Sequence, residues 1–469
     1  MRLKIKALAL LFSVVCVMSS CLGGDDTEYI VYDDTAISSV TLGTLKCYFH
    51  TKSKSGADSV YTGSVTGSSY PMYIDQQKRE VYNVDSLPAG TDLAHVLMTV
   101  NTKNSGIPVL KSLTSDSIFT ISNADSIDFS SPREIIVYSQ SGKYSQKYTV
   151  SLSAHKEYAD SFRWSRLADN TKIASYSKVK ALAFGNDLYL LGTTSTKAEL
   201  IKTATADGNS WSEVSLPASL SANASFVVGD ASLYVADNET IYTSANGNSW
   251  TTTPAAGVKQ LVGACEKELY AISLDGDIIV SLDGGNSWKN DVKDSDKANL
   301  PAQDISAIAK VTDTNSDVYR IVMIGNRLES DINKNDTACV VWSKIVETDK
   351  TKIQPWAYQE FESFNYKKLP CLSGLSATPY SDGLLAIGGK GLATCKNEGF
   401  TQIYYSIDCG ITWHSDYRFT LPVGFSATNA TIASDKDKYL WIISTGSGQV
   451  WRGRLNKLGW KKAPGYIGE

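Results

Sequence analysis

The chain has 469 residues, of which 42% are hydrophobic and 20% are charged. This composition is typical of a folded globular protein and excludes a mostly disordered chain, and the length predicts two or more folding units because a single core rarely grows beyond about 250 to 300 residues. The formal net charge of −4, together with the lack of a basic cluster, gives no reason to expect a nucleic-acid partner.

The N-terminus has the parts of a secretory leader. A short basic stretch (residues 2–6) precedes an apolar run (7–18), which is followed by Ser-Ser-Cys21. Because this run is too short to cross a bilayer as a helix, residues 1–20 are predicted to be a signal peptide. The segment 18–21 resembles the lipobox of bacterial lipoproteins, which implies that Cys21 carries a lipid and attaches the chain to a membrane. An ordinary signal peptide with an incidental cysteine is the alternative.

Residues 21–29 read Cys-Leu-Gly-Gly-Asp-Asp-Thr-Glu-Tyr and are predicted to be a flexible acidic tether. Similar acidic runs follow the lipidated cysteine of Bacteroidota-type lipoproteins that are displayed on the cell surface. The resemblance implies an outer-membrane protein on the cell surface. Since the acidic residues begin only after Leu22-Gly23-Gly24, attachment on the periplasmic face stays open.

Residues 30–155 show short apolar segments separated by Ser, Gly, Asp and Lys, which is the pattern of half-buried antiparallel strands. The clearest pair is 135–138 and 148–152, which are joined by a Ser-Gly turn. Three apolar residues of the second strand alternate and should face one core: Tyr148, Val150 and Leu152. This pair resembles the last hairpin of bacterial immunoglobulin-like domains, which implies a β-sandwich over 30–155.

From residue 160 to the C-terminus at 469, the chain repeats itself. An apolar or aromatic pair with a strand on either side recurs six times: Leu188-Tyr189, Leu233-Tyr234, Leu269-Tyr270, Val318-Tyr319, Leu384-Leu385 and Leu440-Trp441. In four repeats the following strand ends in a turn that closes with tryptophan. These four tryptophan turns are 205–211, 244–250, 281–288 and 406–413. The first three tryptophans are 39 and 38 residues apart, close to the length of a four-stranded propeller blade.

The tryptophan turns resemble the Asp-box of sialidase-like (BNR-repeat) propellers, Ser-x-Asp-x-Gly-x-Thr-Trp. Asp or Asn at the third place can accept hydrogen bonds from backbone N–H groups, Gly supplies a positive φ, and Trp is a large apolar anchor. Two copies are one residue shorter, which leaves their geometry open. The resemblance implies structural residues at blade edges, remote from a central site: Asp207, Trp211, Asn246, Trp250, Asp283, Trp288, Asp408 and Trp413.

Taken together, the pattern predicts an all-β chain with an N-terminal immunoglobulin-like β-sandwich followed by a six-bladed β-propeller over 160–469. The fourth blade lacks the turn and carries Trp342 and Trp356 in its place. Residues 162–166 are expected to close the ring beside the last blade, with 459–461 as a competitor. Seven blades or an unclosed array are the alternatives. Inner strands are expected to start near Val179, Ser225, Val258, Ile305, Leu372 and Ala427.

No catalytic, cofactor-binding or metal residues are predicted. A sialidase needs an arginine cluster that includes an Arg-Ile-Pro segment, and the chain has no such segment. The only histidine of the repeats, His414, is expected at a blade edge, and a Gly-x-Ser-x-Gly elbow is absent. Residues 313–317 resemble the opening of a calcium loop, but Val318 stands where that loop needs Gly, so a plain turn is predicted. Residues 388–391 are also predicted to form a turn.

Six cysteines remain after the leader and Cys21 are set aside, and none shows the close spacing of a zinc or redox motif. Cys395 and Cys409 flank an expected hairpin. A disulfide between them and two buried free thiols are both open.

Two functions follow. The favoured one is a non-catalytic, lipid-anchored binding or scaffolding protein for a glycan or a cell-envelope protein. It resembles two-domain Bacteroidota lipoproteins in which an immunoglobulin-like domain precedes an Asp-box propeller, a group without an agreed activity. The alternative is a surface carbohydrate-active enzyme, a glycoside hydrolase or lyase, whose central pocket would hold two facing carboxylates. The 25 Tyr and 10 Trp could stack on sugars, although most are expected to be blade anchors.

Overall fold

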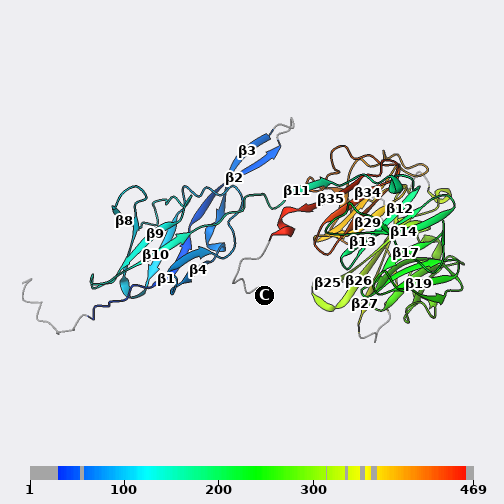
Figure 1. Cartoon of the computed structure of the whole chain (residues 1–469), viewed down its shortest axis with the longest axis horizontal. Helices are drawn as coiled ribbons and strands as arrows, with labels where there is room; N and C mark the ends of the chain where they lie inside the picture. The colour runs from blue at the N-terminus through cyan, green and yellow to red at the C-terminus, as the bar shows by residue number, and fades with distance from the viewer. Residues whose placement is uncertain are drawn as a thin grey trace, which may run out of the picture. The chain divides into compact units, whose positions relative to one another are not determined.

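The computed structural model describes residues 30–52, 58–312, 314–332, 336–348, 354–360 and 367–460. The described residues form two compact units, 30–158 and 159–460, and each is described by itself. Strands dominate both units (Figure 1), as the all-β prediction requires. The predicted signal peptide (1–20), tether (21–29) and lipid site Cys21 lie outside the described residues.

Helices are few and short. The described residues contain one α-helix, α2 (Thr171–Ala174), and 3-10 turns of three or four residues. None of the helices in these ranges has the length and hydropathy needed to span a membrane.

In its described residues, the first unit contains three sheets. The largest has the strand order β4-β5-β10-β9-β7-β8 and is antiparallel except for the parallel pair β5 and β10. The β2–β3 hairpin extends beyond the rest of this unit (Figure 1). The strands are β1 (Ile37–Leu42), β2 (Thr44–Lys52), β3 (Asp58–Thr66), β4 (Met72–Asp75), β5 (Glu80–Asn83), β6 (Met98–Thr102), β7 (Ile107–Lys111), β8 (Ile118–Thr120), β9 (Arg133–Tyr138) and β10 (Ser145–Ser151).

The predicted strand pair at the end of this unit is confirmed. Strands β9 and β10 pair antiparallel, with Tyr148 opposite Ile135. Tyr148 and Val150 are buried in the apolar core of the unit, and Leu152 packs against it from a partly buried position. The alternation of side chains along a strand places these residues on one face, and their burial stabilises the pair.

The second unit contains six sheets within the described residues. The first three are β12 (Lys178–Phe184), β13 (Asp187–Thr193), β14 (Lys197–Ala204), β15 (Ser212–Glu213) with β16 (Leu220–Ser221); β17 (Ser225–Val228), β18 (Leu233–Asp237), β19 (Thr240–Ser244), β20 (Thr251–Pro254); and β21 (Val258–Cys265), β22 (Glu268–Ser273), β23 (Ile278–Ser281), β24 (Lys289–Asn290). The others are β25 (Gln303–Thr312), β26 (Asn315–Asn326), β27 (Val340–Glu347), β28 (Ala357–Tyr358); β29 (Ser376–Tyr380), β30 (Gly383–Ile387), β31 (Tyr404–Ser406), β32 (His414–Ser415); and β33 (Ala430–Ser434), β34 (Leu440–Ser444), β35 (Val450–Leu455), β11 (Phe162–Arg166).

The first strands of the six sheets contact one another in sequence. Strand β12 contacts β17, and the contacts continue through β21, β25, β29 and β33 until β33 meets β12 again. We call these six the inner strands. Apolar side chains between successive sheets form separate buried clusters, so the core of this unit is divided among the sheet interfaces. Burial of these interfaces is the main source of stability that repeated sheets have available.

The first three inner strands begin at or next to the expected residues, at Lys178, Ser225 and Val258. The prediction was wrong for the fifth and sixth, which begin at Ser376 and Ala430, later than expected. Leu372 is 1% exposed but lies in the preceding loop, where it forms an isolated bridge to Gly391. Because apolar residues of the preceding loop also enter the core, the sequence pattern predicted a strand that begins too early.

Hydroxyl side chains connect neighbouring inner strands. The Ser225 Oγ accepts a hydrogen bond from the Leu261 N–H at 2.9 Å, and the Ser306 Oγ accepts one from Ala377 at 3.1 Å. The Thr431 Oγ1 accepts one from the Ala181 N–H at 3.0 Å. The inner strand is an edge of its sheet and would otherwise expose unpaired N–H groups, so these contacts satisfy part of each edge.

The segment 162–166 joins the last sheet, as predicted. Strand β11 pairs antiparallel with β35, so the beginning of the unit completes the sheet formed by its end. The competing segment 459–461 does not take this place, because Asn456–Gly459 is the 3-10 turn η5, and Lys461 lies outside the described residues.

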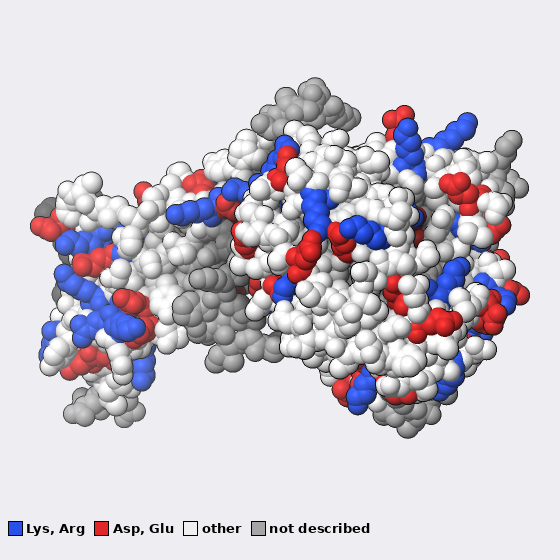
Figure 2. Space-filling view, turned by 45° about the vertical axis from the view of Figure 1, so that its right-hand side comes forward, with Lys and Arg blue, Asp and Glu red and all other residues white. Residues whose placement is uncertain are grey.

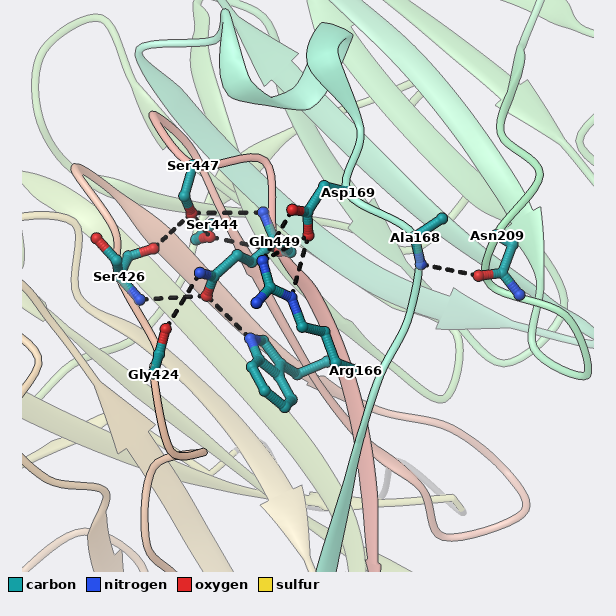
Figure 3. Close-up of polar contacts among 10 residues, drawn as sticks. Arg166, Ala168, Asp169, Asn209, Gly424, Ser426, Ser444, Ser447 and Gln449 are labelled. Atoms are coloured by element: carbon teal, nitrogen blue, oxygen red, sulfur yellow. Dashed lines mark hydrogen bonds and ion pairs between the residues drawn. The ribbon is translucent and has the colours of Figure 1, made fainter.

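Polar contacts fix the chain as it leaves β11 (Figure 3). Arg166 pairs with Asp169 at 2.8 Å, and the Ala168 N–H donates to Asn209 Oδ1 at 2.9 Å in the first tryptophan turn. Nearby, Gln449 Oε1 accepts hydrogen bonds from the Trp451 Nε1–H and from the Ser426 N–H. The strand from the beginning of the unit is thus tied to the first sheet as well as the last.

All six described cysteines are free. The disulfide considered between Cys395 and Cys409 is therefore not formed. Cys395 Sγ lies 3.3 Å from Asn397 Oδ1, and Cys409 packs against an apolar cluster. Burial raises the pKa of Cys265 and of Cys371 to about 12, so these thiols stay protonated and unreactive near neutral pH.

Candidate functional site

The two full-length tryptophan turns share one hydrogen-bond pattern. In the turn at 281–288, Asp283 accepts from the Ser287 N–H at 2.9 Å and from its hydroxyl at 2.5 Å. These bonds hold the pKa of Asp283 at about 2. Gly285 has a φ of 101°, and its carbonyl accepts from the Trp288 Nε1–H at 3.0 Å. The positive φ explains why glycine stands there.

The turn at 406–413 repeats this pattern. Asp408 accepts from the Thr412 N–H at 2.8 Å and from its hydroxyl at 2.6 Å. Burial acts to raise the pKa of Asp408, but the Thr412 bonds outweigh it and the pKa is lowered. Trp413 is 3% exposed and donates to the Gly410 carbonyl at 2.9 Å.

The two shorter turns use the same third residue for the same purpose. Asp207 Oδ2 accepts from the Ser210 N–H at 2.8 Å, and Trp211 donates to the Gly208 carbonyl at 3.2 Å. Asn246 Oδ1 accepts from the Ser249 N–H at 3.0 Å. The Trp250 Nε1–H is buried without a partner, which is where the shorter turn departs from the pattern.

Each tryptophan turn packs against the preceding sheet. Gly285 lies so close to Ile241 that a Cβ would come within 2.9 Å of its Cδ1 atom, and Gly410 packs against Val341. The turn residues singled out from the sequence therefore support the sheet interfaces. They do not line the central cavity described next.

The fourth sheet lacks a tryptophan turn, and other buried residues stabilise its contact with the preceding sheet. Trp356 is 0% exposed and makes an edge-to-face contact with Tyr270 of the preceding sheet, with ring centroids 5.2 Å apart. Its Nε1–H donates to Asp291 Oδ2 at 2.9 Å. The same carboxylate pairs with buried Lys344 at 2.7 Å, and Lys344 also reaches Glu268 at 3.2 Å. A buried charge network thus takes the place of the turn.

A cavity of about 690 Å³ lies among the inner strands, and we call it the channel. Its lining comes mainly from β12, β17, β21, β25 and β29, from the turn between β18 and β19, and from Asn429 just before β33. The polar side chains of this lining that matter below are Lys178, Lys180, Asp237, Glu239, Lys259, Asp304 and Asn429. The volume lies within the range of sites for small molecules and sugars.

Lys180 is the unusual residue of the channel. It is partly buried, and its Nζ donates to the Ile305 carbonyl at 3.4 Å. Desolvation lowers the pKa of Lys180 to about 8, because removal from water disfavours the ammonium form. No carboxylate among the described residues lies within 4.0 Å of the amine, so two of its three donors are open to a ligand.

The carboxylates of the channel are mostly committed to other groups. Asp237 is 6% exposed and accepts from the Ser221 N–H at 2.8 Å and from its hydroxyl. Asp304 Oδ2 accepts from Asn326 at 3.0 Å and from the Gly374 N–H at 3.1 Å. Within the described lining, Glu239 is the one exposed carboxylate without such a bond.

The other motifs have structural explanations. In the segment 313–317, residues 315–317 already belong to β26, and Asn315 lies opposite Thr312, the last residue of β25; Asp313 lies outside the described residues. Residues 388–391 follow β30 as a turn. His414 is on the outer strand β32, with its ring 5.4 Å from that of Tyr405. In the described part of the chain, no three His, Cys, Asp or Glu residues come together as a metal site.

Lys180 was not among the residues predicted from the sequence. A signal was present, because Lys178 and Lys180 share one face of an otherwise apolar strand, Lys-Val-Lys-Ala-Leu-Ala-Phe. Two lysines at alternate positions are unusual in a strand whose only role is to pack against its neighbours, because such a strand normally carries apolar residues there. Only the ring of inner strands shows that this face lines a cavity.

Comparison with known proteins identifies both units. The model of the DUF6242 beta propeller domain matches residues 158–463, and that of the DUF6242 N-terminal domain matches 40–152. The predicted β-propeller is thereby confirmed. No curated protein matches the sequence.

Solved structures with similar folds are distant. YCF48 bound to D1 peptide is 14% identical, with 62% of this chain and 95% of that chain covered and a TM-score of 0.32. A Trichoderma reesei carbohydrate-active enzyme of family AA12 is 9% identical, with 63% and 96% covered and a TM-score of 0.38. The Hadza microbial sialidase Hz136 is 10% identical, with 91% and 92% covered and a TM-score of 0.35.

Proposed function

This chain belongs to the family defined by the DUF6242 N-terminal and beta propeller domains, and on that premise we propose that it is a lipid-anchored cell-envelope protein that binds a ligand without transforming it. The ligand is a glycan or a segment of an envelope protein that enters the channel and contacts Lys180. The observation that carries the proposal is the Lys180 amine, which lies in a cavity of about 690 Å³ with one backbone carbonyl as its partner.

The proposed architecture is an immunoglobulin-like domain followed by a propeller of six blades. The second part is supported by the circuit of contacts from β12 to β33 and back, and by the completion of the last sheet by β11. Completion of one blade by strands from both ends of the domain links the two ends of the ring. The Asp-box character of the four tryptophan turns belongs to the same proposal.

Binding is favoured over glycoside hydrolysis by the state of the channel carboxylates. A glycosidase uses two carboxyl groups about 5 to 9.5 Å apart on either side of the scissile bond. Of the three carboxylates in the described lining, Asp237 and Asp304 each accept several hydrogen bonds that fix them in structural roles. Glu239 alone cannot supply both an acid and a nucleophile or base.

The anchor is proposed at Cys21, which places the protein at the outer membrane, facing the cell surface. Metabolic labelling with a fatty-acid analogue tests this directly. The wild-type chain and a Cys16→Ala control should be labelled, whereas Cys21→Ala should not. Labelling of Cys21→Ala would show that the lipid is attached elsewhere.

A glycan array combined with a turnover assay on the purified full chain tests the binding role. We expect one or more glycans to bind, to lose affinity in Lys180→Met, and to be recovered with unchanged length. Lys259→Met, which removes another lysine of the same lining, is the matched control and should bind more nearly like the wild type. Shortening of any bound glycan would overturn the non-catalytic proposal and favour the carbohydrate-active enzyme.

A further inference from the structure

A second hollow lies on the outside of the propeller, where the last sheet meets the first. It has a volume of about 500 Å³ and is lined by the β33–β34 turn, by β35, and by Thr205 and Ala206 of the first tryptophan turn. Four cationic side chains and one carboxylate line it: Lys436, Lys438, Arg452, Arg454 and Asp437. We call this hollow the basic groove.

The two arginines of the basic groove are held in place by rings and carbonyls. They alternate along β35, so both side chains leave the same face of the strand. The Arg452 guanidinium lies 4.8 Å and that of Arg454 4.2 Å from the ring centroid of Tyr439. Arg452 Nη1 donates to the Thr205 carbonyl at 2.6 Å, and Arg454 Nη1 donates to the Asp437 carbonyl at 3.1 Å. These contacts orient both side chains but leave their charges without an anion.

Three other arginines of this unit are paired with carboxylates. Arg166 pairs with Asp169 at 2.8 Å, Arg327 with Asp336 at 2.9 Å, and Arg418 with Asp416 at 2.8 Å. On the face shown in Figure 2, basic side chains also lie beside acidic ones over much of the surface. In the described chain, no ion pair within 4.0 Å involves any of the four cations of the basic groove.

The turn that carries the lysines is rigid. Asp435 Oδ1 accepts from the Asp437 N–H and from the Tyr439 N–H, each at 2.9 Å, and Asp435 Oδ2 accepts from the Trp441 Nε1–H at 2.8 Å. The turn therefore presents Lys436 and Lys438 on a fixed backbone. Lys436 reaches Asn186 across the junction with the first sheet. Because these side chains are carried on a fixed backbone, binding of a ligand costs less conformational entropy.

We propose that the basic groove binds the sulfate or phosphate groups of an anionic polysaccharide. Guanidinium groups bind oxyanions through paired N–H donors, and nearby lysines add charge attraction. Apart from the Tyr439 ring, which both guanidinium groups contact, Leu458 is the one large apolar side chain of the described lining, and this fits a polar chain better than a lipid surface. This site is separate from the channel and does not depend on the function proposed there.

Calorimetric titration of the full chain with dextran sulfate, polyphosphate and uncharged dextran tests the proposal. Dextran sulfate or polyphosphate should bind at low salt, and the preference between them identifies the oxyanion, whereas dextran should not bind. Arg454→Gln should weaken binding about tenfold, and Lys438→Gln several-fold, because each removes one charged donor. Lys180→Met should bind these polymers like the wild type.

Lys289→Gln is the matched control, because it removes one exposed positive charge from β24, outside the basic groove. It should change the affinity less than twofold. An equal loss in Lys289→Gln, or equal binding of dextran and dextran sulfate, would overturn the proposal. Binding to vesicles of anionic phospholipid without binding to either charged polymer would also overturn it, in favour of a membrane contact.

Discussion

The channel and the basic groove each offer cationic side chains, but they hold them in different ways. Lys180 is enclosed by the inner strands, and its pKa is lowered to about 8 because the ammonium form loses hydration. Arg452 and Arg454 lie at the outer surface against Tyr439, and a guanidinium stays charged at every pH a protein tolerates. One propeller can thus carry a pH-sensitive inner site beside an outer site whose two arginines keep their charge.

The largest expected difference is in pH dependence. Between pH 7 and pH 10 the affinity of a channel ligand that needs the ammonium form should fall roughly a hundredfold, with a midpoint near 8, since deprotonation removes its partner. Dextran sulfate binding at the basic groove should change less than about twofold over the same range. Calorimetric titrations at five pH values measure both. If the two affinities changed equally with pH, the proposed difference between the Lys180 site and the arginine site would be wrong.

Salt should separate the two sites in the opposite direction. Raising the ionic strength from about 0.05 to 0.5 M should weaken dextran sulfate binding by roughly tenfold or more, because exposed charges are screened. Binding in the enclosed channel should weaken less than about threefold. Titrations with a glycan found on the array give the comparison. If the channel ligand is the more salt-sensitive of the two, Lys180 is more exposed to solvent than the structure indicates.

Replacement of the channel amine should stabilise the fold. The Lys180 ammonium is desolvated in the folded chain, so Lys180→Met should raise the free energy of unfolding by about 1 to 2 kcal/mol at pH 7, after allowance for water in the channel. As the pH rises from about 8 to 10.5, the folded wild type has already lost the proton that the unfolded chain still holds. The wild type therefore gains stability over this range, and the advantage of the variant should vanish.

Denaturant unfolding at pH 7 and pH 10.5 measures this difference. Lys259→Met provides the control, because Lys259 is exposed whereas Lys180 is partly buried, so this replacement removes a lysine of the same lining without relieving a desolvated amine. An advantage of Lys180→Met that is equal at both pH values would indicate a packing effect and contradict the account of the amine.

The smallest expected effect concerns the ring under the arginines. Tyr439→Leu removes the aromatic face that both guanidinium groups contact, a contribution of about 0.5 to 1 kcal/mol at exposed sites. Dextran sulfate affinity should fall two- to fivefold, while the channel ligand should bind as before. Titration of both ligands to the same variant checks this, and a loss at the channel alone would contradict the assignment of Tyr439 to the outer site.

The sequence predicted the repeated architecture well because its signals are local. Alternation in 148–152 and the start of β12 near Val179 follow from short apolar patterns that act within a few residues. The start of β29 was missed because Leu372 is buried as a loop residue, and burial alone does not distinguish a loop from a strand.

The candidate sites depend on contacts that no local pattern contains. Lys180 meets Ile305, 125 residues away, and Arg452 meets Thr205, 247 residues away. The segments Lys-Asp-Lys at 436–438 and Arg-Gly-Arg at 452–454 are visible in the sequence. They come close together only because strands β34 and β35 pair as a hairpin. Chain topology therefore creates both sites from residues that look ordinary one at a time.

Competitive labelling of lysines in the full chain, with and without a saturating glycan from the array, tests the central claim most directly. The reagent modifies neutral amines, and mass spectrometry reads each lysine. We expect Lys180 to react near pH 8, to be protected when the glycan binds, and the glycan to be recovered intact, while exposed Lys289 reacts equally in both samples. Equal labelling of Lys180 with and without ligand, or a shortened glycan, would contradict the account.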